Sequence, residues 1–265
     1  LALGWPAFSR LLQGARSVDQ HTATAAPADN LPMMMALLEL WQTHYLKTDT
    51  HAVLPYAQRL ARLPDFLQQL TMESNGKSAT PEGQQVSHHT APVLWGSAGT
   101  IGQHSYYQLL HQGTRSFTAD IILPLSADEG DHTARRALAA HALAQSRAFM
   151  IGRSAEEACR LGAERGFSAA ASRQFELTGN HSHSFITMNS VSPESLGGLI
   201  VAYEHKTFFL AVLLGINCFD QWGVELGKAI ASEMQALLRG DEATVASDPA
   251  TLATVKAWQD ANPTP

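Results

Sequence analysis

The sequence predicts an α/β fold, a three-layer sandwich in which helices cover both faces of a mostly parallel sheet. Short runs of apolar residues alternate along the chain with longer segments whose apolar residues recur at helical spacing. Residues 120–124 are apolar almost throughout, as a parallel strand requires when both of its faces are buried. This alternation is typical of βα units that build a parallel sheet.

The expected elements follow one another in a regular order. Asn30 and Pro32 provide a cap and a first turn for the second helix. Gly96 ends the second strand, and Gly99 leads into the helix after it. Strands are expected at residues 51–56, 92–95, 120–124 and 183–188. Helices are expected at residues 7–18, 32–46, 57–70, 103–111, 133–150, 195–216 and 223–238.

The chain divides into three expected parts. Residues 1–50 form a helical lead-in, residues 51–240 form the α/β domain, and residues 241–265 form an arm rich in Ala, Thr and Asp with one short helix. The chain begins at Leu1, without a Met and without the basic and apolar pattern of a signal peptide. We therefore expect the sequence to be part of a longer protein.

Composition narrows the possible partners and the compartment. The chain has 265 residues, is 45% hydrophobic, and carries a formal net charge of -6 without any basic stripe. Nucleic acid is therefore not expected as a partner, because binding to phosphates needs clustered Lys and Arg. Cys159 and Cys218 follow no metal or redox spacing, which favours a reducing, cytoplasmic setting. The apolar stretch 207–219 is too short to cross a membrane and is expected in the core.

Three segments combine polar groups with glycines in a way that suits a binding site. Residues 72–77 place Glu73 where a helix gives way to a glycine turn, and residues 99–104 place His104 in a glycine-bearing loop. Residues 219–228 begin with polar residues next to bulky apolar side chains and end in Lys228. Each feature also has an ordinary explanation, namely a solvated carboxylate, a surface histidine and a surface lysine. Taken singly, none of them defines a function.

Taken together, these segments resemble the phosphoglucose isomerase family. The matching blocks occur in the family's order and at similar separations, and the last of them is close to the family's carboxyl-terminal signature. The blocks are residues 19–21, 50–56, 72–77, 102–104 with 107–114, 203–206 and 219–228. The resemblance implies a homodimeric enzyme built from two sugar-isomerase (SIS-type) domains. This chain is then similar to the second domain with its carboxyl-terminal arm, and the amino-terminal half is missing.

The resemblance also implies roles for individual residues. Glu73 matches the catalytic base, and Gln69, one helical turn earlier, matches a glutamine that contacts the substrate. His104 matches a histidine that reaches the substrate of the neighbouring subunit and helps to open the sugar ring. Lys228 matches a lysine that assists at the ring oxygen, and Gln221 matches a glutamine that lines the same pocket.

The implied reaction interconverts glucose 6-phosphate and fructose 6-phosphate through a cis-enediol, as part of glycolysis and gluconeogenesis, without a metal or an organic cofactor. One carboxylate that removes and returns the proton suits this chemistry, while His and Lys suit ring opening. In the family, the serine/threonine loop that binds the phosphate and a Gly-Gly-Arg block come from the half that precedes Leu1. The chain alone is therefore expected to be inactive.

Other interpretations remain open at this point. Sugar-isomerase domains also occur in sugar-phosphate-binding regulatory modules, which need no proton-transfer groups, and some isomerases of this family act outside cells. The 12 histidines follow no zinc-site spacing, which favours surface or core positions. The sequence departs from the family pattern at Ser97, Ala98, Ile101 and His181, changes that flank the named residues and indicate a divergent branch.

Overall fold

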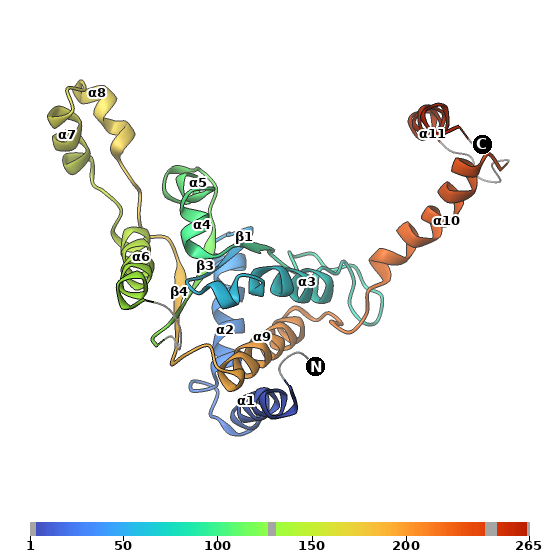
Figure 1. Ribbon diagram of the computed structural model, residues 1–265, viewed down its shortest axis with the longest axis horizontal. Coiled ribbons are helices and arrows are strands. Elements are labelled where there is room, and N and C mark those ends of the chain that lie inside the picture. The colour runs from blue at the N-terminus through green and yellow to red at the C-terminus, as the bar shows by residue number, and fades with distance from the viewer. Residues whose placement is uncertain (1–3, 127–130, 242–247, 264–265) are drawn as a thin grey trace. The chain divides into compact units, whose positions relative to one another are not determined.

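A computed structural model describes residues 4–126, 131–241 and 248–263 (Figure 1). The chain forms two compact units, Leu1–Cys218 and Phe219–Pro265. The first unit holds the sheet and the helices packed on it, and the second consists of helices. The expected boundaries at residues 50 and 240 stay predictions.

The first unit is built on a parallel sheet of four strands in the order β2-β1-β3-β4. Every pairing is parallel, with Ala52 of β1 opposite Trp95 of β2 on one side and Ala119 of β3 on the other. The predicted α/β class with a parallel sheet is confirmed. The strands are β1 Thr50–Pro55, β2 Val93–Gly96, β3 Thr118–Pro124 and β4 His183–Met188.

Helices form the outer layers of the first unit. Asn30 caps the second helix as expected, since its side chain accepts a hydrogen bond from the Met33 amide at 3.3 Å. The longer helices are α1 Gly4–Thr24, α2 Leu31–Leu40, α3 Leu63–Asn75, α6 His132–Ile151, α7 Ala155–Glu164 and α9 Pro193–Leu214. Shorter turns are η1 Trp41–Tyr45, η2 Gln58–Leu60, α4 Gly99–Gln103, α5 Tyr107–Gln112, α8 Ala169–Ser172 and η3 Arg173–Phe175.

Two of the apolar cores lie on opposite faces of the sheet and produce the three layers. Successive residues of a strand point to opposite faces, so neighbours in β1 and in β3 enter different cores. One core joins alternate strand residues to α5 and α6 through Ala52, Leu54, Ile121, Tyr107 and Phe149. The other core joins the intervening strand residues to α3 and α9 through Val53, Ile122, Leu67 and Tyr203.

Helix α9 is the central helix of its layer. It packs closely against α1 because Gly14 and Gly197 carry no side chain; a Cβ at either glycine would overlap a carbonyl oxygen of the other helix. By length and hydropathy α9 is apolar enough to cross a membrane. In this fold Tyr203, Leu210 and Ala211 of α9 are buried in the cores. The expected burial of the apolar stretch 207–219 holds only in part, because Phe208, Val212 and Leu213 are exposed.

Some element boundaries differ from the sequence-based expectation. The helix expected at residues 103–111 is two short helices, because α4 ends at Gln103 and α5 begins at Tyr107. The helix expected from residue 57 starts at Leu63, after the single turn of η2, and places Pro64 in its first turn, where proline is tolerated. Helices α7 and α8 were not expected.

The second unit contains η4 Trp222–Val224, α10 Glu225–Arg239 and α11 Pro249–Ala261. Helix α10 corresponds to the helix expected at residues 223–238, and α11 corresponds to the short helix expected in the arm. Residues 242–247 and 264–265 of the expected arm lie outside the described residues.

Candidate active site

Glu73 lies in the last turn of α3 and is half-buried. Gln69 lies one turn earlier on the same face, and its Nε2 atom donates to the Oε2 atom of Glu73 at 3.5 Å. The structure therefore brings these two expected site residues together. A long, single hydrogen bond of this kind leaves the carboxylate able to accept a proton from a bound molecule.

The end of α3 is fixed on both sides of Glu73. Asn75 is fully buried, and its Nδ2 atom donates to the Thr207 carbonyl of α9 at 3.0 Å. The Lys77 ammonium donates to the carbonyl oxygens of Glu73 and Ser74, both at 2.7 Å, which satisfies backbone groups at the helix terminus. The backbone around the carboxylate is therefore held by core contacts.

His104 follows β2 and α4 and is exposed to solvent. The neighbouring Gln103 is anchored, because its Nε2 atom donates to the Tyr56 hydroxyl at 3.0 Å, and that hydroxyl lies 3.0 Å from the hydroxyl of Tyr107. A Cβ at Gly99 would overlap the ring of Tyr56, so only glycine fits this close approach. Burial raises the pKa of Tyr56 and of Tyr107, which keeps both hydroxyls protonated as hydrogen-bond donors.

Glu73 and His104 of one chain lie at opposite edges of the sheet. The Lys77 amide donates to the Thr90 hydroxyl at 3.3 Å, and Thr90 lies just before β2, so the end of α3 is at the amino edge. His104 follows the carboxyl end of β2, next to the Gln103 contact with Tyr56, which follows β1. The sheet therefore separates the two side chains.

Gln221 and Lys228 belong to the second unit. Gln221 precedes η4, and Lys228 lies in the first turns of α10, with both side chains exposed within that unit. The meeting of these residues with Glu73 in one pocket stays a prediction.

The departures from the family pattern have local structural roles. The Ser97 hydroxyl lies 2.7 Å from the hydroxyl of Tyr106, while Ile101 is exposed. Asn180 adopts a positive φ of 54°, a conformation that Asn tolerates. The His181 ring packs against Phe117. Burial lowers the pKa of His181, and the nearby His111 and His183 lower it further. That these substitutions surround the site stays a prediction.

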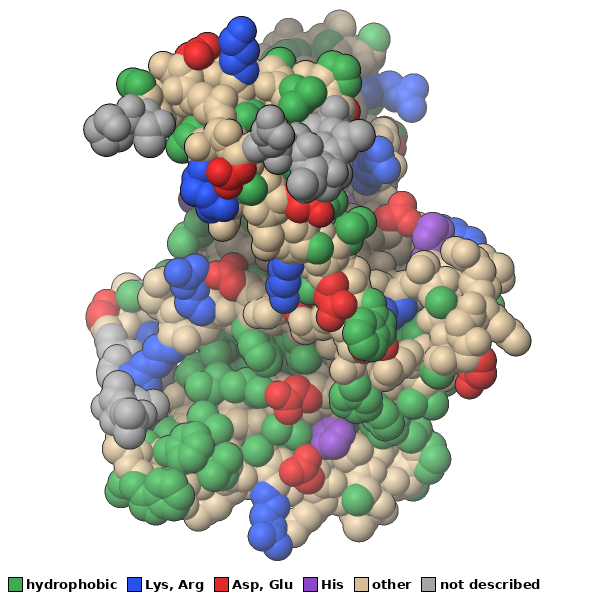
Figure 2. Space-filling view, turned by 90° about the vertical axis from the view of Figure 1, so that its right-hand side faces the viewer, with side chains coloured by type: hydrophobic (Ala, Val, Ile, Leu, Met, Phe, Trp, Pro, Cys, Tyr) green, Lys and Arg blue, Asp and Glu red, His purple; other side chains and the backbone are tan. Residues whose placement is uncertain are grey.

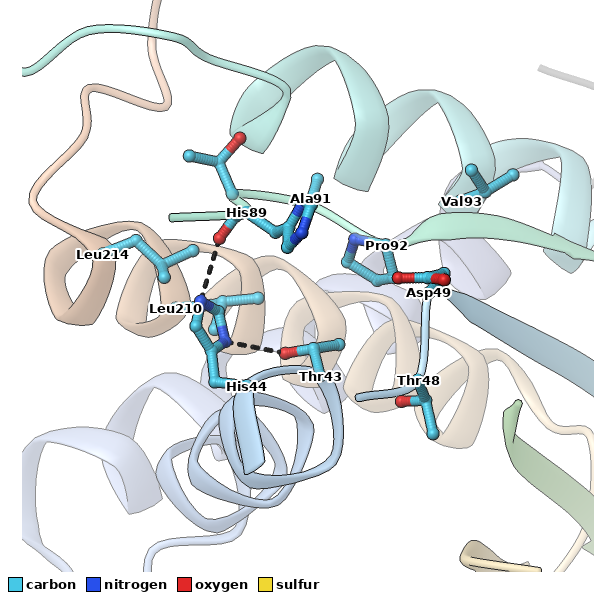
Figure 3. A pocket seen from close by; sticks show the side chains of 11 residues that line it. Thr43, His44, Thr48, Asp49, His89, Ala91, Pro92, Val93, Leu210 and Leu214 are labelled. Atoms are coloured by element: carbon cyan, nitrogen blue, oxygen red, sulfur yellow. Dashed lines mark hydrogen bonds between the residues drawn. The ribbon is translucent and has the colours of Figure 1, made fainter. Parts of the chain in front are cut away.

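A small cavity lies near the amino edge of the sheet, between η1, the segment leading into β2, and the end of α9 (Figure 3). The His44 ring closes one side, with its Nδ1 atom 3.0 Å from the Thr43 hydroxyl and its Nε2 atom 2.9 Å from the His89 carbonyl. The cavity holds about 190 Å³. Small-molecule sites usually hold about 300–1,000 Å³, so we assign no ligand here.

The histidines do not gather into a metal site within the described parts of the chain. No group of three or more His, Cys, Asp or Glu side chains is placed there to hold an ion. The His183 Nε2 atom instead lies 2.8 Å from the Ser146 hydroxyl, and the His111 Nε2 atom lies 2.8 Å from the Gln145 side-chain oxygen. These rings therefore serve as hydrogen-bonding core residues.

A buried charged network lies between the sheet and α9. It joins side chains from four elements, and sequence reasoning did not single it out. The Lys206 ammonium pairs with the Glu39 carboxylate, which also accepts from the His51 Nδ1 atom at 2.8 Å. On the other side, the Tyr203 hydroxyl donates to the Asp120 carboxylate at 2.8 Å. The available signal was the placement of His51, Asp120 and Lys206 within apolar segments.

The charges of this network stabilise one another. Burial alone would raise the Glu39 pKa, but Lys206 and His51 outweigh it and lower that pKa to about 2. Burial alone would lower the His51 pKa, but the carboxylates of Asp120 and Glu39 raise it to about 9. The same two carboxylates raise the Lys206 pKa against the effect of burial. All four groups are therefore charged at neutral pH.

Comparison with known proteins shows what the chain is similar to. It matches the family model described as Phosphoglucose isomerase over residues 1–255. A glucose-6-phosphate isomerase of Jannaschia sp. (strain CCS1) is 44% identical over 264 residues, covering 97% of this chain and 49% of that protein. One from Hahella chejuensis is 41% identical over 267 residues, covering 99% of this chain and 48% of that protein.

A solved structure is also similar to this chain. The crystal structure of a glucose-6-phosphate isomerase from Chlamydia trachomatis matches with a TM-score of 0.81 at 33% identity, covering 97% of this chain and 47% of that one. The chain spans about half the length of the curated relatives it matches. Because the family model covers nearly the whole chain, the chain belongs to the phosphoglucose isomerase family.

Proposed function

We propose that this chain is the catalytic-base half of a glucose-6-phosphate isomerase that interconverts glucose 6-phosphate and fructose 6-phosphate. The observation that carries the proposal is the family match over residues 1–255, together with Glu73 held at a fixed helix end beside Gln69. The enzyme acts in glycolysis and gluconeogenesis, in the cytoplasm. The amino-terminal half completes the site.

In the proposed mechanism the proton moves between C2 and C1 of the open sugar through a cis-enediol. Glu73 removes the proton and returns it, and Gln69 orients the carboxylate through its hydrogen bond. Lys228 and the His104 of a second subunit open the ring, since Lys and His exchange protons at the ring oxygen and the anomeric hydroxyl. No metal or organic cofactor takes part in this proton transfer.

Exposed apolar side chains support an assembly larger than this chain. Figure 2 shows hydrophobic side chains gathered in the lower half of one face, where α1 lies. Trp5 is 72% exposed, and the face of α9 that turns away from the core is also apolar. The large exposed apolar residues of these two helices are Trp5, Phe8, Leu12, Phe208, Val212 and Leu213. Such gathered apolar groups mark surfaces that other protein covers, here the amino-terminal half or a second copy.

Complementation tests this proposal. The purified chain is assayed for isomerisation of fructose 6-phosphate alone and after co-expression with the amino-terminal half of the Jannaschia relative. We expect no activity from this chain alone and activity from the co-expressed halves, because phosphate binding and proton transfer then meet in one site. A mixture that binds fructose 6-phosphate without turning it over contradicts the proposal and favours a regulatory binding module.

A further inference from the structure

A cavity of about 600 Å³ opens at the carboxyl edge of the sheet. Its walls come from the segment after β1, from the end of β3 with the residues that follow, from the segment between β4 and α9, and from the first turns of α6. The lining residues include Tyr56, Leu123, Pro124, Leu138, Ala139 and Val191. These residues form a largely apolar wall. The volume falls in the range of about 300–1,000 Å³ that small-molecule sites occupy.

The position of the cavity follows from the order of the strands. The chain runs from β1 outward to β2 on one side and then returns to place β3 on the other side of β1. The carboxyl ends of β1 and β3 therefore flank a topological switch point. In open parallel sheets this crevice is where ligands bind, since the loops after the two strands diverge there. Tyr56 and Leu125 follow these two strands and line the cavity.

Among the residues that the structure describes, the rim of the cavity is basic. Arg59 follows β1, while His132, Arg135 and Arg136 lie in the first turns of α6. Only 18 residues of the whole chain are Lys or Arg, and three of them gather at this one cavity in a protein of net charge -6. None of the described residues that line it is acidic. The only acidic side chain at the start of α6 that the structure describes, Asp131, caps the Ala134 amide at 3.3 Å.

Arg136 is the side chain best placed to meet a ligand. It is exposed and makes no hydrogen bond or ion pair with another of the residues that the structure describes. Arg135 also lines the cavity, and one terminal nitrogen of its guanidinium lies 2.9 Å from the His132 Nδ1 atom. Planar guanidinium groups bind phosphate oxygens in pairs of parallel hydrogen bonds. The positive end of the 20-residue helix α6 adds to the attraction for an anion.

We propose that this cavity binds a small phosphate monoester that carries a flat apolar group, such as a mononucleotide. The rim arginines hold the phosphate, and the wall of Tyr56, Leu123 and Leu138 receives the apolar group. Each part of the ligand alone binds more weakly, since the arginines supply most of the charge and the wall supplies most of the apolar contact area.

The cavity is separate from the proposed proton-transfer carboxylate of the same chain. The cavity opens at the carboxyl edge of the sheet, whereas Glu73 lies at the amino edge. Neither Glu73, Gln69 nor His104 lines it. A ligand in this cavity therefore leaves the proton-transfer carboxylate of the same chain uncovered.

Calorimetric titration of the whole 265-residue chain tests the proposal, with adenosine monophosphate as the probe and inorganic phosphate and adenosine as the two partial ligands. We expect saturable binding of the monophosphate below 1 mM (about −4 kcal/mol corresponds to 1 mM) and at least about tenfold weaker binding of each partial ligand. Arg136→Gln should weaken binding of the monophosphate by about tenfold or more.

Arg147→Gln is the matched control. Arg147 is an exposed arginine on the same helix that does not line the cavity, so this variant should bind like the wild type. Both variants replace exposed side chains, and thermal unfolding checks that both are folded. Absence of saturable binding, equal losses in the two arginine variants, or inorganic phosphate binding as tightly as the monophosphate would each overturn the proposal.

Discussion

The Nδ1 atom of His51 lies 2.8 Å from the Oε2 atom of Glu39, and both side chains are almost completely buried beneath α9. The opposite ring nitrogen of His51 lies 3.0 Å from the Oδ2 atom of Asp120, without the alignment of a hydrogen bond. The imidazolium thus lies between two carboxylates, while Lys206 provides the second positive charge. Because α2, β1, β3 and α9 each contribute one charge, the network ties four elements together.

This arrangement makes the stability of the fold depend on pH. The His51 pKa of about 9 in the folded chain lies above the ordinary value of about 6.5. The resulting stabilisation is fully present below about pH 6.5 and is lost as the pH rises through about 9. We expect the free energy of unfolding to fall between these values by on the order of 3 kcal/mol more in the wild type than in His51→Gln.

Urea unfolding at pH 6.5, 7.5 and 9 measures this difference. His141→Gln replaces an exposed histidine on α6 and should follow the wild-type pH profile. The two proteins are compared by the slope of the free energy of unfolding against pH. The absolute values differ anyway, because His51→Gln also loses hydrogen bonds and is less stable at every pH. Parallel profiles for wild type and His51→Gln would show that His51 is not charged in the core.

The contact between α1 and α9 depends on a missing side chain. A Cβ at Gly197 would overlap the Leu11 carbonyl oxygen of α1, whereas a Cβ at the next residue, Gly198, would meet Val18 at an ordinary 3.4 Å. We expect Gly197→Ala to destabilise the chain by about 2 kcal/mol or more, because helix backbones must move apart. Gly198→Ala should be neutral or stabilising by up to about 1 kcal/mol, the gain in helix propensity. Chemical denaturation of the two variants measures both changes in the free energy of unfolding. Equal changes would contradict the close packing of α1 and α9 at Gly197.

Removal of the proposed base should slow the proton-transfer step and leave binding of the sugar phosphate nearly unchanged. In the isomerase assembled from both halves, Glu73→Gln should lower kcat by on the order of 10³-fold and abolish deuterium exchange at C2 of the sugar phosphate. The KM should change little, since Gln keeps the shape of the side chain. Glu82→Gln, at an exposed loop position, is the control. A Glu73→Gln enzyme with more than about a tenth of the wild-type kcat would exclude Glu73 as the base.

Mixed dimers test whether His104 serves a second subunit. Glu73→Gln and His104→Gln should each inactivate the assembled enzyme, but subunits of the two variants mixed together should regain activity. Random mixing gives about one quarter of wild-type activity, since about half of the dimers are mixed and each mixed dimer contains one intact site. A site completed within one chain would give no recovery. Gel filtration of the mixture confirms that subunits have exchanged.

The sequence predicted the parallel sheet well because its strands are apolar on both faces. His183 and Met188 bound both the expected and the observed fourth strand. The break between α4 and α5 was not predictable, since Gln103 at the end of α4 is held by Tyr56, which lies 47 residues away in sequence. Local propensity cannot report such tertiary contacts.

The candidate site was predictable to a similar extent. Gln69 and Glu73 are one helical turn apart, so their contact follows from helix geometry alone. The charged network was missed because Glu39 and Lys206 are distant in sequence, and nothing local distinguishes a buried lysine from a surface one. The basic cavity was missed for the same reason, as Arg59 and Arg136 converge only in the folded sheet.

The pairing of α1 with α9 also has a consequence for synthesis on the ribosome. Arg10 of α1 and Glu194 of α9 form an ion pair across a separation of 184 residues. At typical rates of about 5–20 residues per second, about 10–40 s pass before α9 emerges to cover α1. During that time the apolar face of α1 has no partner from its own domain. A helix made early in this unit is thus packed late, and nascent-chain chaperones have a long opportunity to bind there.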